Sequence, residues 1–366
     1  MKARFRLEGE NMNMENNKPF RRGGSLKADR ITLAHGSGGK AMRDLIDDVF
    51  VSAFDNPAMG EMEDQARISL DSLQAQGNRL AFTTDSFVVD PLFFPGGDIG
   101  KLAIYGTVND LAVGGAKPLY LTCSMILEEG LEIEVLREVV ASMRAAADLA
   151  NVSIVTGDTK VVHKGACDKL FINTAGVGVI PEGVEIGARR VKPGDQLLVN
   201  GVLGDHGAAI LNARGDMALT SPVESDCQPL YDLVETLLKA APGTTSIRDA
   251  TRGGLASAVN EIAQAANLGV EMSEEDIPLR KEVRGFCEIL GLDPLYLANE
   301  GTLVAFVPQQ QAQDALAAMR SLDAGKEAAI IGSAVEIHPG QVIMNSSFGG
   351  QRIVDMLVGD QLPRIC

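Results

Sequence analysis

From Ile31 onward, strand-like and helix-like segments alternate along the chain, and one turn-rich stretch divides them into two halves. Short apolar runs typical of buried strands alternate with longer segments whose apolar residues recur at helical spacing. The dividing stretch, residues 181–195, is rich in Gly and Pro. This alternation predicts an α/β (α+β) protein, because such segments fold into sheets covered by helices.

The two halves are similar in size, and a chain of 366 residues suits two domains. We predict domains at residues 31–182 and 190–350, preceded by a disordered basic extension (1–30) and followed by a mobile tail (351–366). The predicted strands are residues 79–84, 119–127, 152–156, 169–180, 196–200, 302–307 and 328–335. The predicted helices are residues 99–115, 131–150, 226–240, 253–267 and 309–321.

Acidic residues outnumber basic ones, 49 Asp and Glu against 33 Lys and Arg, for a formal net charge of −16. We therefore expect no nucleic-acid partner, because nonspecific binding needs clustered positive charge. No apolar run reaches the roughly 20 residues of a membrane-spanning helix, so no membrane association is expected. The five cysteines are widely spaced and form no CxxC pair, which argues against a disulfide framework and indicates a cytoplasmic protein.

Two glycine-rich turns precede predicted helices and offer backbone amides to an anion. The first comprises Gly36, Ser37, Gly38, Gly39 and Lys40; it is not a Walker P-loop, because Ala34 and Ala41 stand where that motif needs Gly and Ser or Thr. The second contains Asp249, Thr251 and Arg252 before two further glycines. Each turn has two readings, a phosphate cradle or a capped helix start.

Three aspartates stand at expected element ends or on a helix. Asp85 and Asp158 each follow a predicted strand, and Asp110 lies on the helix predicted at 99–115. Carboxylates at strand ends meet at one edge of a sheet, where Mg²⁺ and its phosphate ligands bind. The alternative for each is an ordinary turn or helix-capping residue. Three in similar settings favour a Mg-nucleotide site.

The chain ends in Pro363-Arg364-Ile365-Cys366. Pro363 blocks a helix and favours an extended tail, so a terminal thiol could reach distant sites. The α-carboxylate of Cys366 raises its thiol pKa, and a nearby cation would have to offset that to produce a nucleophilic thiolate. The alternative is an incidental cysteine on a frayed end.

Seven motifs together resemble the carbamoyl dehydratase family of hydrogenase maturation factors, which belongs to the PurM-like, AIR synthase-related superfamily. They are HGSGGK, TTDSFVVDPLFFPGG, GTVNDLAVGGA, TGDTKVV, RDATRGG, ANEG and the terminal PRIC. The resemblance runs from about residue 31 to residue 366 and leaves the first 30 residues unexplained. It implies a PurM-like two-domain fold in which the N-terminal domains of two chains pair into a barrel-like homodimer.

The resemblance also implies where the site lies. ATP and Mg²⁺ would sit in a cleft near the dimer interface, with Asp85, Asp110 and Asp158 as the acidic motifs that bind Mg-ATP. The turn from Gly36 to Lys40 would be a mobile N-terminal loop. Asp249, Thr251 and Arg252 would form the phosphate-side turn of the second domain.

The implied reaction begins when a partner, HypF, loads a carbamoyl group onto Cys366. ATP then activates the carboxamide oxygen, loss of phosphate leaves a thiocyanate, and cyanide passes to an iron held by a HypC–HypD complex. Lys160 and Glu300 match positions thought to act on the carboxamide, and the sequence leaves open which of them accepts the proton. His206, in GDHG, is expected to line the cleft.

Two other classes of function remain open at this point. One stays within the superfamily: AIR synthetase, thiamine-monophosphate kinase or selenophosphate synthetase. A selenophosphate synthetase would carry a reactive Cys near its N-terminal glycine loop, and here the first cysteine is Cys123. The other is a non-catalytic thiol carrier that only presents Cys366 to partners.

Overall fold

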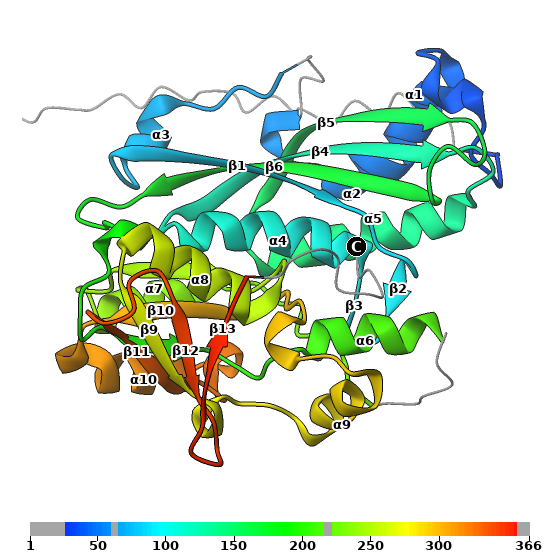
Figure 1. The fold of residues 1–366 in the computed structure, drawn as a ribbon. Helices are drawn as coiled ribbons and strands as arrows, with labels where there is room; N and C mark the ends of the chain where they lie inside the picture. The colour runs from blue at the N-terminus through cyan, green and yellow to red at the C-terminus, as the bar shows by residue number, and fades with distance from the viewer. Residues whose placement is uncertain (1–25, 60–64, 216–221, 357–366) are drawn as a thin grey trace, which may run out of the picture.

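The computed structural model describes residues 26–59, 65–215 and 222–356, and its two larger sheets lie one above the other with helix α4 (Ile99–Val113) between them (Figure 1). Most of the predicted basic extension and the terminal Cys366 lie outside the described residues. The predicted α/β architecture is confirmed, and the stretch 181–195 connects the last strand of the first sheet to the first of the second.

The first sheet has four strands in the order β1-β6-β4-β5. Its strands are β1 (Arg79–Phe87), β4 (Lys117–Glu128), β5 (Ser153–Val162) and β6 (Leu170–Ile180). β6 runs antiparallel to both β1 and β4, whereas β4 and β5 are parallel. A small hairpin of β2 (Phe93–Phe94) and β3 (Gly97–Asp98) precedes helix α4.

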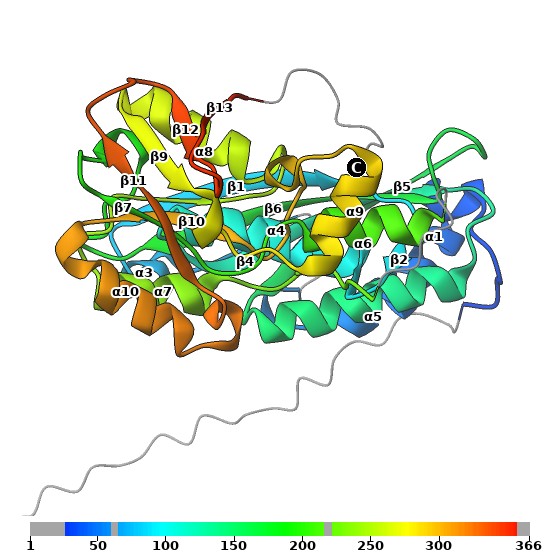
Figure 2. The ribbon, with the colours of Figure 1, turned by 60° about the horizontal axis from the view of Figure 1, so that its bottom comes forward.

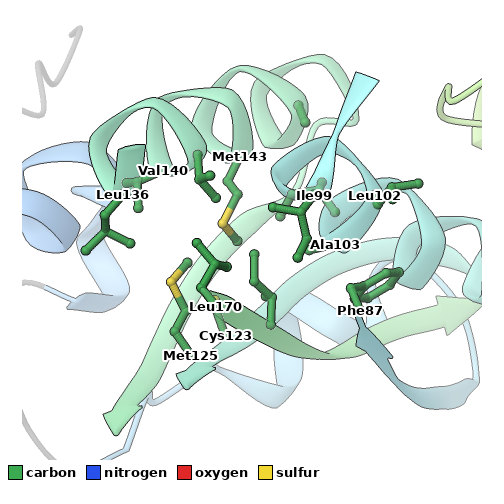
Figure 3. Close-up of a cluster of buried hydrophobic side chains, with 14 of the residues drawn as sticks. Phe87, Ile99, Leu102, Ala103, Cys123, Met125, Leu136, Val140, Met143 and Leu170 are labelled. Atoms are coloured by element: carbon green, nitrogen blue, oxygen red, sulfur yellow. The ribbon is translucent and has the colours of Figure 1, made fainter. Parts of the chain in front are cut away.

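Two long helices cover one face of this sheet, α4 (Ile99–Val113) and α5 (Ile133–Leu149). Leu136, Val140 and Met143 recur at helical spacing on α5 and are buried. They pack with α4 and with inward-facing residues of the strands, as Figure 3 shows. The N-terminal helices are short: α1 (Lys40–Leu45), a π-helical stretch (Ile46–Val51), α2 (Ser52–Phe54) and α3 (Leu70–Gln74).

The second sheet has seven strands in the order β13-β12-β9-β11-β7-β10-β8. They are β7 (Gln196–Val199), β8 (Ser246–Asp249), β9 (Gly269–Ser273), β10 (Leu303–Val307), β11 (Ala329–Val335), β12 (Val342–Asn345) and β13 (Gln351–Val354). Four of these, β8, β9, β12 and β13, were not predicted. Each is only four or five residues long, too short for a clear alternating pattern.

Helices cover both faces of the second sheet, α7 and α10 on one and α8 on the other (Figure 2). Strand β10 shows this: Leu303 and Ala305 pack with α7 and α10, and the alternate residues Val304 and Phe306 pack with α8. The helices are α6 (Asp205–Arg214), α7 (Tyr231–Ala240), α8 (Gly254–Ala266), α9 (Lys281–Leu290) and α10 (Ala312–Arg320). Every predicted helix is confirmed, with ends displaced by at most five residues.

Candidate functional site

Acidic side chains from both halves gather where α4 passes between the sheets. Asp85 comes from β1 and Asp110 from α4, while Asp249 is the last residue of β8. Glu300 comes from the turn before β10, and its carboxyl lies within electrostatic range of Asp85 and Asp249. We call Asp85, Asp110, Asp249 and Glu300 the acidic group.

One arginine from the second half enters this group. Arg252 Nη2 donates a hydrogen bond to Asp85 Oδ1 at 2.6 Å, which joins the turn before α8 to β1. Thr83, two residues before Asp85 on the same strand face, donates to Asp110 Oδ2 at 2.8 Å. The sequence-predicted residues Asp85, Asp110, Asp249 and Arg252 are therefore neighbours in a single chain.

Crowding and burial alter the proton affinities of these carboxyls. Burial and the nearby charge of Asp249 raise the pKa of Asp110 to about 6. Burial raises the pKa of Asp249 as well, and the charge of Asp85 adds to that rise. The pKa of Glu300 is raised well above its ordinary value by burial and by the charges of Asp226, Asp249 and Asp85. The carboxylates of the acidic group thus repel one another, and a bound cation would reduce this repulsion.

A cavity of ≈ 440 Å³ opens beside the acidic group. Asp110 and Asp249 line it together with Thr251, Arg248 and Arg252. Two arginines beside carboxylates can hold a phosphate and its counter-cation at the same place. The predicted phosphate-side turn, residues 249–252, therefore lines the same cavity as the predicted acidic residue Asp110.

Asp158 and Lys160 lie on the opposite face of the first sheet from Asp85. Asp85 is paired with Thr174 of β6, while Asp158 lies opposite Ser124, which is in turn opposite Asn173. Adjacent residues of a strand point to opposite faces, so Asp85 faces α4 and Asp158 faces away from it. Lys160 Nζ is 3.6 Å from Asp158 Oδ2 on that outer face.

A single chain therefore does not bring Asp158 together with Asp85 and Asp110. Asp85 and Asp158 lie inside β1 and β5 rather than after them, because both strands keep pairing for several residues beyond the predicted ends. The glycine turn lies beside β5 as well, next to the inward-facing Val161 rather than on the outer face with Asp158. A Cβ at Gly36 would approach Val161 of β5 to 2.8 Å, so this turn packs against the same strand.

Lys40, at the end of that turn, is exposed and donates to Asp44 Oδ2 at 2.6 Å. We call Asp158 and Lys160 the outer-face group; the glycine turn 36–40 is the neighbour of their strand, next to Val161. The predicted site residues thus divide into the acidic group with Thr251 and Arg252, the outer-face group, and the glycine turn beside β5. Cys366 lies outside the described residues.

His206 does not line the cavity beside the acidic group. Its ring is buried, with Nδ1 2.9 Å from Ser225 Oγ and an edge-on contact to Phe94 at 5.6 Å between ring centroids. Burial lowers the pKa of His206 to about 3, so the ring is neutral. The expectation that it lines the cleft is wrong, because the start of α6 turns this side chain into the core.

Two residues outside the sequence-predicted set connect to Glu300. Asn109, adjacent to Asp110, donates to the backbone oxygens of Gln228 and Glu300 at 3.0 and 3.3 Å and accepts from Leu230 N at 2.8 Å. Asp226 accepts hydrogen bonds from the turn that carries Glu300. Only the position of Asn109 beside Asp110 could have drawn attention to it, and no local pattern marks Asp226.

The donor chemistry of the acidic group suits a hard divalent cation such as Mg²⁺, because it offers several carboxylate oxygens with mutual repulsion. Within the described residues, no set of three or more His, Cys, Asp or Glu side chains is arranged to hold a metal ion by itself. Phosphate oxygens would therefore have to supply further ligands. Among those same residues, no helix is long and apolar enough to cross a membrane.

Two protein-family models match this chain. "AIR synthase related protein, N-terminal domain" matches residues 62–180, and "AIR synthase related protein, C-terminal domain" matches residues 192–345. A carbamoyl dehydratase HypE of Rhodobacter capsulatus is 63% identical over 342 residues, covering 93% of this chain and 100% of that protein. The HypE of Escherichia coli K12 is 54% identical over 338 residues, 92% of this chain and all of that protein.

Solved structures show the same similarity. A hydrogenase maturation protein HypE crystallised in complex with ATP has a TM-score of 0.86 at 48% identity, covering 91% of this chain and 99% of that one. A chain from a HypE–HypF complex has a TM-score of 0.74 at 44% identity, covering 87% of this chain and 100% of that one.

Proposed function

The chain belongs to the HypE family of carbamoyl dehydratases, and from this membership we propose that it acts in [NiFe] hydrogenase maturation by converting an S-carbamoyl group on Cys366 into a thiocyanate. The carboxamide oxygen attacks the γ-phosphorus of ATP, ADP leaves, and the oxygen then departs as phosphate. The nitrogen loses both of its protons, so R–S–CO–NH₂ and ATP become R–S–CN, ADP and phosphate.

The observation that carries this proposal is the meeting of Arg252 with the acidic group beside a polar cavity. Phosphoryl transfer needs charge neutralisation and positioning more than covalent participation by the protein. Arg252 and the Thr251 turn support the phosphates. Mg²⁺, held by Asp85 and Asp110 with Asp249 beside them, would neutralise phosphate charge; Asp158 is the third predicted ligand.

Glu300 is the group that we assign to proton removal from the carboxamide nitrogen. Its raised pKa makes its carboxylate a stronger base than an ordinary glutamate. Lys160, on the outer face, is assigned to support of the carboxamide or of the developing phosphate charge.

We further propose that two chains pair through the outer face of the first sheet. Three apolar side chains there are exposed in the single chain: Leu80 is 47% exposed, Phe82 71% and Ile126 40%. Apolar side chains gathered on one sheet face favour burial against another protein surface. Such a homodimer can bring the outer-face group of one chain toward the acidic group of its partner, which a single chain does not do.

The proposal includes two partners and a location. HypF is the carbamoyl donor, in keeping with the relative that was crystallised with HypF. A HypC–HypD complex accepts the cyanide, and the reaction takes place in the cytoplasm. The ten residues after residue 356 could span at most about 35 Å, and this length limits how far from residue 356 Cys366 could act.

The proposal is tested by mass spectrometry of the C-terminal peptide after incubation with HypF, carbamoyl phosphate, ATP and Mg²⁺. The wild-type peptide should first gain a carbamoyl group and then lose the mass of one water. Cys366→Ala should still bind ATP and gain no mass, whereas the control Cys167→Ala should behave as wild type. A peptide that stops at the carbamoyl mass would identify the chain as a thiol carrier.

A further inference from the structure

We propose that Asp226 is a positioning residue for Glu300: its carboxylate holds the turn 300–302 in the conformation that directs Glu300 toward Asp85 and Asp249. This inference rests on the proposed role of Glu300 in proton removal. Asp226 lies in the segment that leads into α7, far in sequence from the turn.

Both carboxylate oxygens of Asp226 are used by the turn that carries Glu300. Oδ1 accepts from Glu300 N at 2.9 Å, and Oδ2 accepts from Gly301 N at 3.0 Å and from Thr302 Oγ1 at 2.9 Å. Hydrogen bonds to an ionised acceptor are stronger than neutral ones, and three of them on one carboxylate define the local backbone closely. The backbone of the proposed base is thus fixed by a side chain from a distant segment of the sequence.

Close packing reinforces this contact. A side chain at Gly301 would collide with the backbone oxygen of Asp226, so the two segments can approach only because residue 301 is glycine. Asn200, directly after β7, donates to Gly301 O at 3.0 Å, and Asn109 of α4 donates to Glu300 O. The turn is therefore held from three directions, and Asp226 supplies the largest share of its hydrogen bonds.

Asp226 also contributes to the charge around Glu300. The groups that face Glu300 are Asp226 before α7, Asp249 at the end of β8, Asp85 on β1 and Arg252 before α8. The thiol of Cys227 is within electrostatic range of Glu300. Burial and the charge of Glu300 raise the pKa of the Cys227 thiol. Replacing Asp226 by a neutral residue would both loosen the turn and remove one of the charges that make Glu300 more basic.

The test is the rate at which the carbamoyl group on Cys366 is dehydrated in Asp226→Asn, followed by mass spectrometry with HypF, carbamoyl phosphate, ATP and Mg²⁺. An amide has one acceptor oxygen where the carboxylate has two, so at least one N–H of the turn loses its acceptor. We expect dehydration to slow by about 10²-fold, the size of a lost general-base contribution, with ATP affinity unchanged.

Asp195→Asn is the matched control. Asp195 is a buried aspartate that belongs, like Asp226, to the second half, and it accepts from Lys192 N at 2.9 Å and Thr245 Oγ1 at 2.8 Å. It precedes β7, at the opposite end of that strand from Asn200 and the turn. Dehydration by Asp195→Asn should match the wild type. If Asp226→Asn does not fold, the isosteric Thr302→Val removes one of the three hydrogen bonds and should slow dehydration several-fold.

A double variant separates positioning from general destabilisation. If Asp226 acts through Glu300, then Asp226→Asn should add nothing to the defect of Glu300→Gln. A double variant slower than Glu300→Gln alone by the full Asp226→Asn factor would overturn the inference, as would wild-type dehydration by Asp226→Asn. Wild-type dehydration by Glu300→Gln would instead refute the proposed base, and the inference with it.

Discussion

The guanidinium of Arg252 lies 2.6 Å from the carboxylate of Asp85, although 167 residues separate them in the sequence. Arg252 belongs to the second half and Asp85 to the first sheet. This ion pair places a cation beside carboxylates that otherwise repel one another, and Arg252 also lines the neighbouring cavity. Both requirements of phosphoryl transfer, a cation for the phosphate and carboxylates for Mg²⁺, thus meet at the junction of the two halves.

Arg252→Ala should slow ATP-dependent dehydration by about 10²-fold, because it removes a cation from the developing phosphate charge. The free energy of unfolding should change by less than about 1 kcal/mol, since the Arg252 side chain is 74% exposed and exposed ion pairs contribute little. Single-turnover kinetics and denaturant unfolding measure the two quantities. Arg320→Ala, also in the second half, is the control; equal rates for the two variants would contradict the assignment.

Asp110→Asn should stabilise the ligand-free protein at pH 8 but not at pH 4. Because burial and Asp249 raise the pKa of Asp110 to about 6, its ionised form is disfavoured in the folded state. The stability associated with the protonated carboxyl is fully present below the ordinary pKa of 3.8 and is lost as the pH rises through about 6, by on the order of 3 kcal/mol. Thermal unfolding of both proteins across this range measures the difference. A variant less stable than the wild type at pH 8 would contradict the expected sign.

Mg-ATP should stabilise the wild type more than the Asp110→Asn variant.

Asp85→Asn and Lys160→Ala should each be inactive alone and recover activity when the two chains are mixed. If the acidic group of one chain works with the outer-face group of its partner, each heterodimer contains one intact site. Random pairing then restores about a quarter of wild-type activity. A mixture of Asp85→Asn with Asp249→Asn should recover nothing, because both changes affect the acidic group. Absence of recovery in the first mixture would show that the two groups do not work across a dimer.

Phe82→Glu should convert the dimer into a monomer, because it places a charge in the centre of the proposed apolar interface. Phe82 is 71% exposed in the single chain, so the fold itself should persist. Light scattering after size-exclusion chromatography and circular dichroism measure these two properties. Leu149→Glu alters a residue of similar exposure, 68%, at the end of α5 and should leave the dimer intact. A dimeric Phe82→Glu protein would place the interface elsewhere.

The local pattern of apolar residues was sufficient to predict the longer helices and strands. The helical spacing of Leu136, Val140 and Met143 predicted α5, and the apolar run 169–180 predicted β6 almost to the residue. Short strands such as β8 and β13 were missed, because four residues do not establish a period and their stability comes from pairing with distant strands. Motifs also identified Asp85, Asp110, Asp249 and Arg252, which the fold then brings together.

The sequence by itself therefore determined which elements form, which side chains can carry charge chemistry and which family the motifs resemble. Only the tertiary structure decided which of those side chains meet. Asp158 was expected beside Asp85, yet the register of four paired strands turns the two carboxylates to opposite faces of one sheet. Asp226 entered the site for the same reason: its carboxylate reaches Glu300 through a contact between segments 74 residues apart. Strand register and long-range packing depend on the whole chain, and a local pattern of residues does not contain them.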